Sequence, residues 1–142
     1  MSEAAFKEML LVEDNSADVY LTREAVADCS KEIHVWCTGN GLEALAFLRK
    51  HPPCEHVPSP ALILLDLNLP KLDGLEVLRA LRQMPAYQET PVVIFSSADR
   101  DFSEKWCLQA GANEFVQKPS DLDGFFTTIR DIVCKWMAPE GA

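Results

Sequence analysis

Several features that would assign a protein class are missing from this chain. It has no run of about eighteen apolar residues, the length that a membrane-spanning helix needs, and no apolar start of the kind that directs secretion. Clusters of lysine and arginine are missing too, since 13 basic residues stand against 22 acidic ones, for a formal net charge of −9. We therefore expect a cytoplasmic protein that binds neither membranes nor nucleic acid.

The five cysteines form no C-x-x-C pair and are widely scattered. This spacing indicates reduced thiols, most of them small core residues, with Cys54 in a proline-rich segment as the most exposed. No repeat, low-complexity tract or linker divides the 142 residues, and an apolar content of 48% suffices for one core. We expect one domain over residues 8–137, with 1–7 and 138–142 as flexible termini.

Five short apolar runs alternate with longer amphipathic segments, a pattern typical of a doubly wound, five-stranded parallel α/β sheet with helices on both faces. The expected strands are 8–12, 33–38, 61–66, 91–96 and 114–117. The expected helices are 18–29, 41–50, 74–84, 102–110 and 122–137. Segment 51–60 contains four prolines and so cannot be helix interior; it is either a surface spacer or a contact loop.

The most informative segment, ALILLDLNLPKLDG, runs from Ala61 to Gly74. Its apolar strand ends in Asp66, and an acid there is unfavourable unless it is paired, hydrogen-bonded or metal-bound. Open parallel sheets carry their sites at this carboxyl edge of the strands. The same edge would receive the residues that follow the other strands, namely Glu13, Asp14, Ser96, Ser97 and Lys118.

Three carboxylates at one edge repel one another unless a cation shares them, and oxygen ligands suit Mg²⁺. Asp14 and Asp66 are the expected direct ligands, with Glu13 acting through water and the backbone carbonyl of Asn68 as a further ligand. Beside Mg²⁺ and the ammonium of Lys118, an ionised carboxylate can attack phosphorus, because both cations neutralise charge on the transferred oxygens. We therefore interpret Asp66 as a nucleophile toward a phosphoryl group.

This ordered set of motifs resembles the receiver domain of response regulators. The resemblance rests on Glu13-Asp14, Asp66 followed by Leu-Asn-Leu-Pro-Lys-Leu-Asp-Gly, Ser96, Ala110-Gly-Ala112, Phe115 and Lys118-Pro119. It covers about residues 8–137 and implies the flavodoxin-like (βα)5 receiver fold with strand order 2-1-3-4-5. It also implies that Asp66 is the phosphoacceptor, that Ser96 and Lys118 assist it, and that Glu13, Asp14 and Asn68 form the Mg²⁺ site.

The resemblance further implies a place in two-component signalling. A sensor histidine kinase would phosphorylate Asp66, Ser96 would move toward the phosphoryl group, and Phe115 would turn inward. The face formed by the fourth helix, fifth strand and fifth helix would then signal to an effector or a histidine phosphotransfer protein. We expect no enzyme beyond self-catalysed phosphotransfer and slow autodephosphorylation, because Ala98 has no group that could orient a hydrolytic water. No output domain is visible, so a stand-alone regulator is expected.

The proline-rich segment and the last helix with Trp136 resemble the small receivers that serve cyanobacterial phytochromes, so a phytochrome-type kinase is a candidate partner. Apolar side chains at Phe102, Trp106 and Trp136 motivate a homodimer hypothesis.

Two other interpretations of the site stay open. One is a Mg²⁺-dependent phosphohydrolase with an aspartyl-phosphate intermediate, although such enzymes resemble D-x-D-G-[TS] and here Asn68 stands two residues after Asp66. The other is a phosphorylation-independent scaffold, against which the complete acid set with Lys118 argues.

Overall fold

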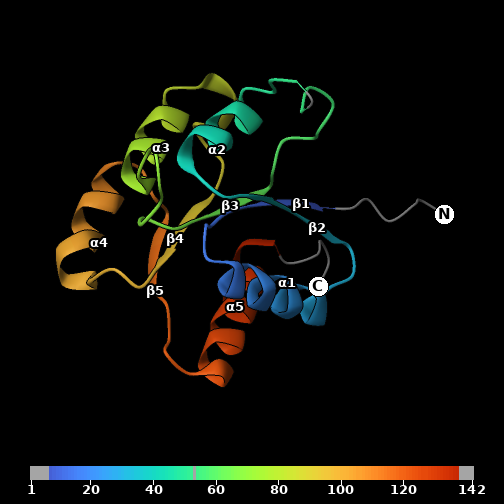
Figure 1. The fold of residues 1–142 in the computed structure, drawn as a ribbon, viewed down its shortest axis with the longest axis vertical. Coiled ribbons are helices and arrows are strands. Elements are labelled where there is room, and N and C mark those ends of the chain that lie inside the picture. The colour runs from blue at the N-terminus through green and yellow to red at the C-terminus, as the bar shows by residue number, and fades with distance from the viewer. Residues whose placement is uncertain (1–6, 53, 138–142) are drawn as a thin grey trace.

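The computed structural model describes residues 7–52 and 54–137, which form three layers with a parallel sheet in the middle (Figure 1). The strands are β1 (Lys7–Val12), β2 (Ile33–Thr38), β3 (Leu62–Leu65), β4 (Val92–Ser96) and β5 (Glu114–Gln117). The helices are α1 (Ser16–Cys29), α2 (Gly41–Leu48), α3 (Gly74–Arg82), α4 (Arg100–Gln109) and α5 (Leu122–Met137), with a short 3-10 helix η1 (Pro85–Tyr87). The strand order β2-β1-β3-β4-β5 confirms the expected doubly wound fold.

Two apolar cores lie on opposite faces of the sheet. Helices α2, α3 and α4 pack over one face, and α1 and α5 over the other (Figure 1). Strand β3 shows why its sequence is continuously apolar: Ile63 and Leu65 enter the first core, whereas Leu62 and Leu64 enter the second. The strand that leads to the candidate site is therefore fixed from both sides.

Two helices begin earlier than the apolar pattern indicated. Helix α1 starts two residues before the expected start because Asn15 caps it, its side-chain oxygen accepting from the backbone N–H of Asp18 at 3.0 Å. Helix α4 likewise starts two residues early, with Asp99 accepting from the N–H of Asp101 at 3.0 Å. The first turns of both helices are polar, so apolar spacing alone did not mark them.

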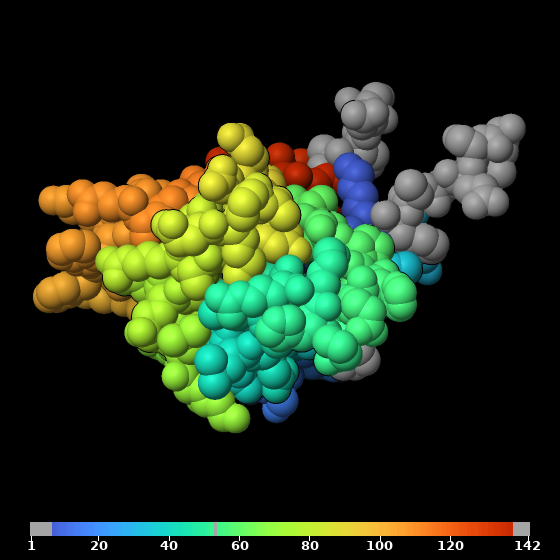
Figure 2. Space-filling view, turned by 90° about the horizontal axis from the view of Figure 1, so that it is seen from above, coloured from blue at the N-terminus to red at the C-terminus, as the bar shows by residue number. Residues whose placement is uncertain are grey.

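The proline-rich segment is packed on the domain. Cys54 and Val57 contact the core on the α2 side, and the carbonyl of Val57 accepts a hydrogen bond from Lys50 Nζ. In the space-filling view from above, this segment (turquoise to green) is continuous with the surface of α2 (Figure 2). These contacts make it part of the fold as well as a surface loop.

All five cysteines are free thiols. Four of them lie in or against the two cores: Cys29, Cys37, Cys54 and Cys107. The expectation that Cys54 is the most exposed is wrong, because its loop packs against the core, whereas Cys134 on α5 is exposed to solvent.

The termini expected to be flexible fall mostly outside the described residues. Residues 1–6 and 138–142 are not described, and Lys7 belongs to β1, where its N–H donates to the carbonyl of Glu32 at 2.8 Å. Within the described chain, none of the helices has the length and apolar character needed to cross a bilayer.

Candidate functional site

Asp66 lies where β3 ends and the loop to α3 begins. Its N–H donates to the carbonyl of Val12 at 3.1 Å, and its Oδ1 accepts from the N–H of Asn68 at 3.2 Å. The start of α3 lies directly against this turn: a Cβ on Gly74 would stand 2.2 Å from the carbonyl oxygen of Asp66. The absence of a side chain at Gly74 therefore lets the loop close and holds Asp66 in place.

Three acids meet at this edge of the sheet, as the sequence predicted. Glu13, Asp14 and Asp66 each offer one oxygen, and these oxygens lie within 4.8 Å of one another. Glu13 and Asp66 are buried, whereas Asp14 is exposed. Carboxylate oxygens this close together are suitable ligands for a hard divalent cation such as Mg²⁺.

Glu13 is the most enclosed of the three acids. Its Oε2 accepts from the N–H of Asn15 at 3.1 Å, and its Oε1 accepts from Lys118 Nζ at 2.7 Å. Burial nevertheless raises the pKa of Glu13 to about 7, with the nearby charge of Asp66 acting in the same direction. The carboxyl group of Glu13 therefore takes up a proton more readily than that of an exposed glutamate.

Lys118 joins the acids through its ammonium group. Its Nζ lies 2.7 Å from Glu13, 2.8 Å from Asp18 and 3.3 Å from Asp66. Burial lowers the pKa of Lys118, but the hydrogen bonds to Asp18 and Glu13 outweigh burial, so the net pKa is raised above its usual range. The ammonium therefore stays charged beside the candidate nucleophile.

Asp18 is the one carboxylate of this group that sequence reasoning missed. It lies in the first turn of α1, four residues after Asp14, and not at the end of a strand. No sequence signal indicated it, because Asp14 precedes the Asn15 cap and shares no helical turn with Asp18.

Ser96 and Ser97 point in different directions at the end of β4. Ser96 is fully buried and Ser97 is exposed, as strand alternation predicted. Ser96 Oγ accepts from the N–H of Ala98 at 3.2 Å, and its carbonyl accepts from the N–H of Lys118 at 2.9 Å. The backbone thus ties the candidate switch hydroxyl to the loop that carries the lysine.

Phe115 already lies inside the core on the α4 side and is buried. The structure therefore shows the inward position, which the sequence interpretation expected only after phosphorylation. A phenyl ring has no polar atom that needs a partner, so this burial leaves nothing unsatisfied.

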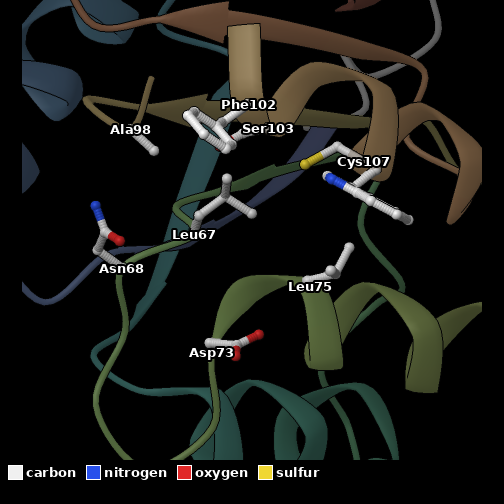
Figure 3. Close-up of a pocket in the computed structure, with 9 residues that line it drawn as sticks. Leu67, Asn68, Asp73, Leu75, Ala98, Phe102, Ser103 and Cys107 are labelled. Carbon is white, nitrogen blue, oxygen red and sulfur yellow. The ribbon is translucent and has the colours of Figure 1, made fainter. Parts of the chain in front are cut away.

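A hollow of about 380 Å³ adjoins the loop after β3. Figure 3 shows Asn68 and Ala98 on one side of it, with Phe102 from α4 and Leu75 from α3 facing the space between the two helices. Asn68 is exposed to solvent, while its backbone N–H donates to Asp66 Oδ1.

The exposed aromatic residues are fewer than expected. Phe102 and Trp106 on α4 are 77% and 56% exposed, and both line the hollow. Trp136 is half-buried, because its Nε1–H donates to Glu114 Oε1 at 3.0 Å. Of the three side chains in the expected patch, the two on α4 are therefore exposed, together with Leu108 of the same helix.

Residues 9–130 match the sequence model of the response regulator receiver domain, and the chain belongs to this family. Response regulator Rcp1 of Synechocystis sp. is 34% identical over 131 residues, which cover 92% of this chain and 89% of that protein. The polar-differentiation response regulator DivK of Brucella anthropi is 32% identical over 124 residues, covering 87% and 94%.

Solved structures of response regulators also superimpose on this chain. The phosphorylated cyanobacterial phytochrome response regulator RcpA superimposes with a TM-score of 0.90 at 35% identity, covering 94% of this chain and 96% of that one. The Mn(2+)-bound form of Rcp1 superimposes with a TM-score of 0.87 at 34% identity, covering 96% of each chain. Fold and family are thereby confirmed.

Proposed function

We propose that this protein is a phosphoacceptor switch of two-component signalling, in which Asp66 receives a phosphoryl group from a histidine kinase. The observation that carries the proposal is the contact between Asp66 and the buried ammonium of Lys118 at 3.3 Å, beside two further acids that could share a cation. Together they supply a nucleophile, positive charge for the transferred oxygens, and ligands for a metal.

Asp14 and Asp66 would hold Mg²⁺ directly, Glu13 would act through water, and the backbone carbonyl of Asn68 would add a ligand. The oxygen-only ligand set supports this choice, as does the family relative that was solved with Mn²⁺. When bound, the ion neutralises negative charge on the transferred phosphoryl oxygens.

The chemical step needs no side-chain base, because Asp66 attacks as a carboxylate. A carboxylate oxygen forms a new bond to phosphorus, while the bond from phosphorus to the phosphohistidine nitrogen breaks. The electron pair of the broken bond stays on the imidazole, which takes a proton from solvent. Lys118 donates a hydrogen bond to a phosphoryl oxygen, and the product is an acyl phosphate on Asp66.

Phosphorylation would then favour the arrangement in which Ser96 donates its hydroxyl proton to a phosphoryl oxygen. Ser96 Oγ accepts from the backbone of Ala98, which leaves its O–H as a donor. Phe115 is already buried in the core on the α4 side, so the change that we propose for the α4–β5–α5 face is a population shift among arrangements around Ser96 and not an inward turn of Phe115. Because Ala98 offers no side-chain group for a water, hydrolysis of the acyl phosphate is slow.

The identity and TM-score with RcpA and Rcp1 support a phytochrome-type kinase as the donor. The exposed Phe102 and Trp106 on α4 support an effector, a histidine phosphotransfer protein or a second copy of the chain as the partner of the switched face. We therefore propose a cytoplasmic location.

Intact-protein mass after incubation with acetyl phosphate and Mg²⁺ tests the proposal. We expect the mass of one phosphoryl group to be gained, only with Mg²⁺, and to be absent from Asp66→Asn. Asp101→Asn is the matched control, since this exposed acid in the first turn of α4 has no role in the chemistry. A gain of phosphoryl mass in Asp66→Asn would refute the proposal. So would the absence of that gain in folded wild type. Rapid release of many phosphates per protein from excess donor, with no accumulation of the acyl phosphate, would favour the phosphohydrolase interpretation.

A further inference from the structure

Asp18 is the one member of the charged cluster that the proposed chemistry does not use. Its Oδ2 accepts a hydrogen bond from Lys118 Nζ at 2.8 Å, a shorter contact than the 3.3 Å between Lys118 and Asp66. We propose that Asp18 is a positioning residue that holds Lys118 in the unphosphorylated protein and competes with the phosphoryl group for its ammonium. This inference rests on the proposed function and concerns the regulation of the same site.

The competition follows from the number of donors. A lysine ammonium has three N–H groups, and here Glu13, Asp18 and Asp66 each accept one. A phosphoryl oxygen on Asp66 needs a donor from the same ammonium. While Asp66 still carries its carboxylate charge, Lys118 must therefore release one of its present partners to bind the incoming phosphoryl oxygen.

Burial decides which partner is released. The side chains of Glu13 and Asp66 are 3% and 7% exposed, whereas that of Asp18 is 24% exposed. A buried carboxylate that loses its counterion is left without solvation, which is strongly unfavourable. Water can replace Lys118 at Asp18 more readily than at either other acid. Asp18 is therefore the partner that gives way.

This exchange affects the two directions of the reaction differently. Before phosphorylation, Lys118 must leave Asp18 on the way to the transition state, so the Asp18 contact raises the barrier. In the acyl phosphate, Asp66 no longer carries a carboxylate charge and Lys118 is already on the phosphoryl oxygen, so hydrolysis requires no further exchange at Asp18. Removing the charge of Asp18 therefore accelerates phosphorylation and leaves hydrolysis unchanged.

The test compares the initial rate of phosphorylation of Asp18→Asn with wild type, using acetyl phosphate, Mg²⁺ and intact mass. We expect an increase of about fivefold, which corresponds to about 1 kcal/mol. The rate of hydrolysis after removal of the donor should equal that of wild type. If Asp18 only stabilised the fold, Asp18→Asn would be phosphorylated more slowly than wild type. It would not show faster phosphorylation with an unchanged rate of hydrolysis.

Asp101→Asn is the matched control for charge. Both Asp18 and Asp101 lie in the first turn of a helix, α1 and α4, and both substitutions remove one negative charge beside the same edge of the sheet. Asp101 makes no contact with Lys118 among those that the structure gives for the lysine. An equal acceleration in Asp101→Asn would assign the effect to general repulsion of the anionic donor and overturn the proposal.

A double-mutant comparison tests the contact itself. In a Lys118→Met background, Asp18→Asn should no longer accelerate phosphorylation, because there is no ammonium left to release. An acceleration that persists in this background would overturn the proposal. So would an unchanged or slower rate in both Asp18→Asn and a second variant, Asp18→Ala, once circular dichroism shows that each is folded. Wild type that takes up no phosphoryl group would instead refute the proposed function, and this inference with it.

Discussion

Substituting Gly74 by alanine should destabilise the protein, although alanine is ordinarily the better helix residue. Gly74 is the first residue of α3, and alanine in a helix interior is favoured over glycine by about 1 kcal/mol. Here the added Cβ would lie 2.2 Å from the carbonyl oxygen of Asp66 and 2.7 Å from Cα of Leu67. Both are backbone atoms, so neither can move away by rotating a side chain.

The expected magnitude follows from what must shift. Relieving the contact requires the start of α3 to move away from the turn after β3, and overpacking of this kind costs about 1–3 kcal/mol. The same movement lengthens the hydrogen bond from Gly74 N–H to the carbonyl of Leu67, now 3.0 Å, for a further loss of about 1 kcal/mol. After subtracting the gain of about 1 kcal/mol from alanine, we expect a net loss of about 1–3 kcal/mol in the free energy of unfolding.

Urea unfolding followed by circular dichroism measures this loss. With an m-value of about 1–3 kcal/mol/M, the midpoint should fall by about 1 M with little change in m. Gly39→Ala is the matched control, because a Cβ at Gly39 meets no atom within 4 Å, and its stability should stay within about 0.5 kcal/mol of wild type.

A Gly74→Ala protein as stable as wild type or as Gly39→Ala would refute the argument that the turn cannot yield. A second measurement connects the turn to the site. Because the close contact is with the carbonyl of Asp66, the shift also moves a proposed metal ligand, so Mg²⁺ should raise the midpoint of Gly74→Ala less than that of wild type.

Two further predictions concern the metal site and the thiols. Asp14→Ala should lower Mg²⁺ affinity by at least about tenfold in titration calorimetry, because it removes one of three carboxylates from the cluster; an unchanged affinity would contradict the ligand assignment. Burial raises the pKa of the Cys107 thiol to about 11, so at pH 8 the thiol stays protonated as well as inaccessible. Iodoacetamide should therefore modify exposed Cys134 in the folded protein and Cys107 only in urea, as read by peptide mass; equal rates in native buffer would argue against this burial.

The elements of this fold were predictable wherever burial dictates the sequence. Strand β3 is apolar at every position because each side chain enters one of the two cores. Helix α5 was predicted with its observed bounds, since Phe125, Ile129 and Val133 repeat at helical spacing and are buried. The starts of α1 and α4 were missed by two residues, because the hydrogen bonds of polar caps determine them.

The residues of the candidate site also fall into those that the sequence indicates and those that it does not. Glu13 and Asp66 could be found because each follows an apolar strand, and the carboxyl ends of parallel strands meet at one edge. Asp18 could not, because its contact with Lys118 depends on how α1 packs beside the loop after β5. Outside the site, Arg82 gives a second example. Its guanidinium donates to the carbonyl of Gly111 at 2.8 Å, and the two residues are 29 positions apart, so no local sequence pattern indicates the pair.

The charges of the site show what a lysine and a bound cation would each contribute. Asp14, Asp18, Glu13 and Asp66 bring four carboxylates to one edge, and Lys118 supplies one positive charge in direct contact with three of them. A divalent ion would leave the group close to neutral, and an arriving phosphoryl group would restore the excess of negative charge. Releasing Asp18, the most exposed of the three acids that contact Lys118, to water is the least unfavourable response to that excess. The position of Asp18 at the rim, on a helix and not on a strand, makes this release feasible without moving the buried acids.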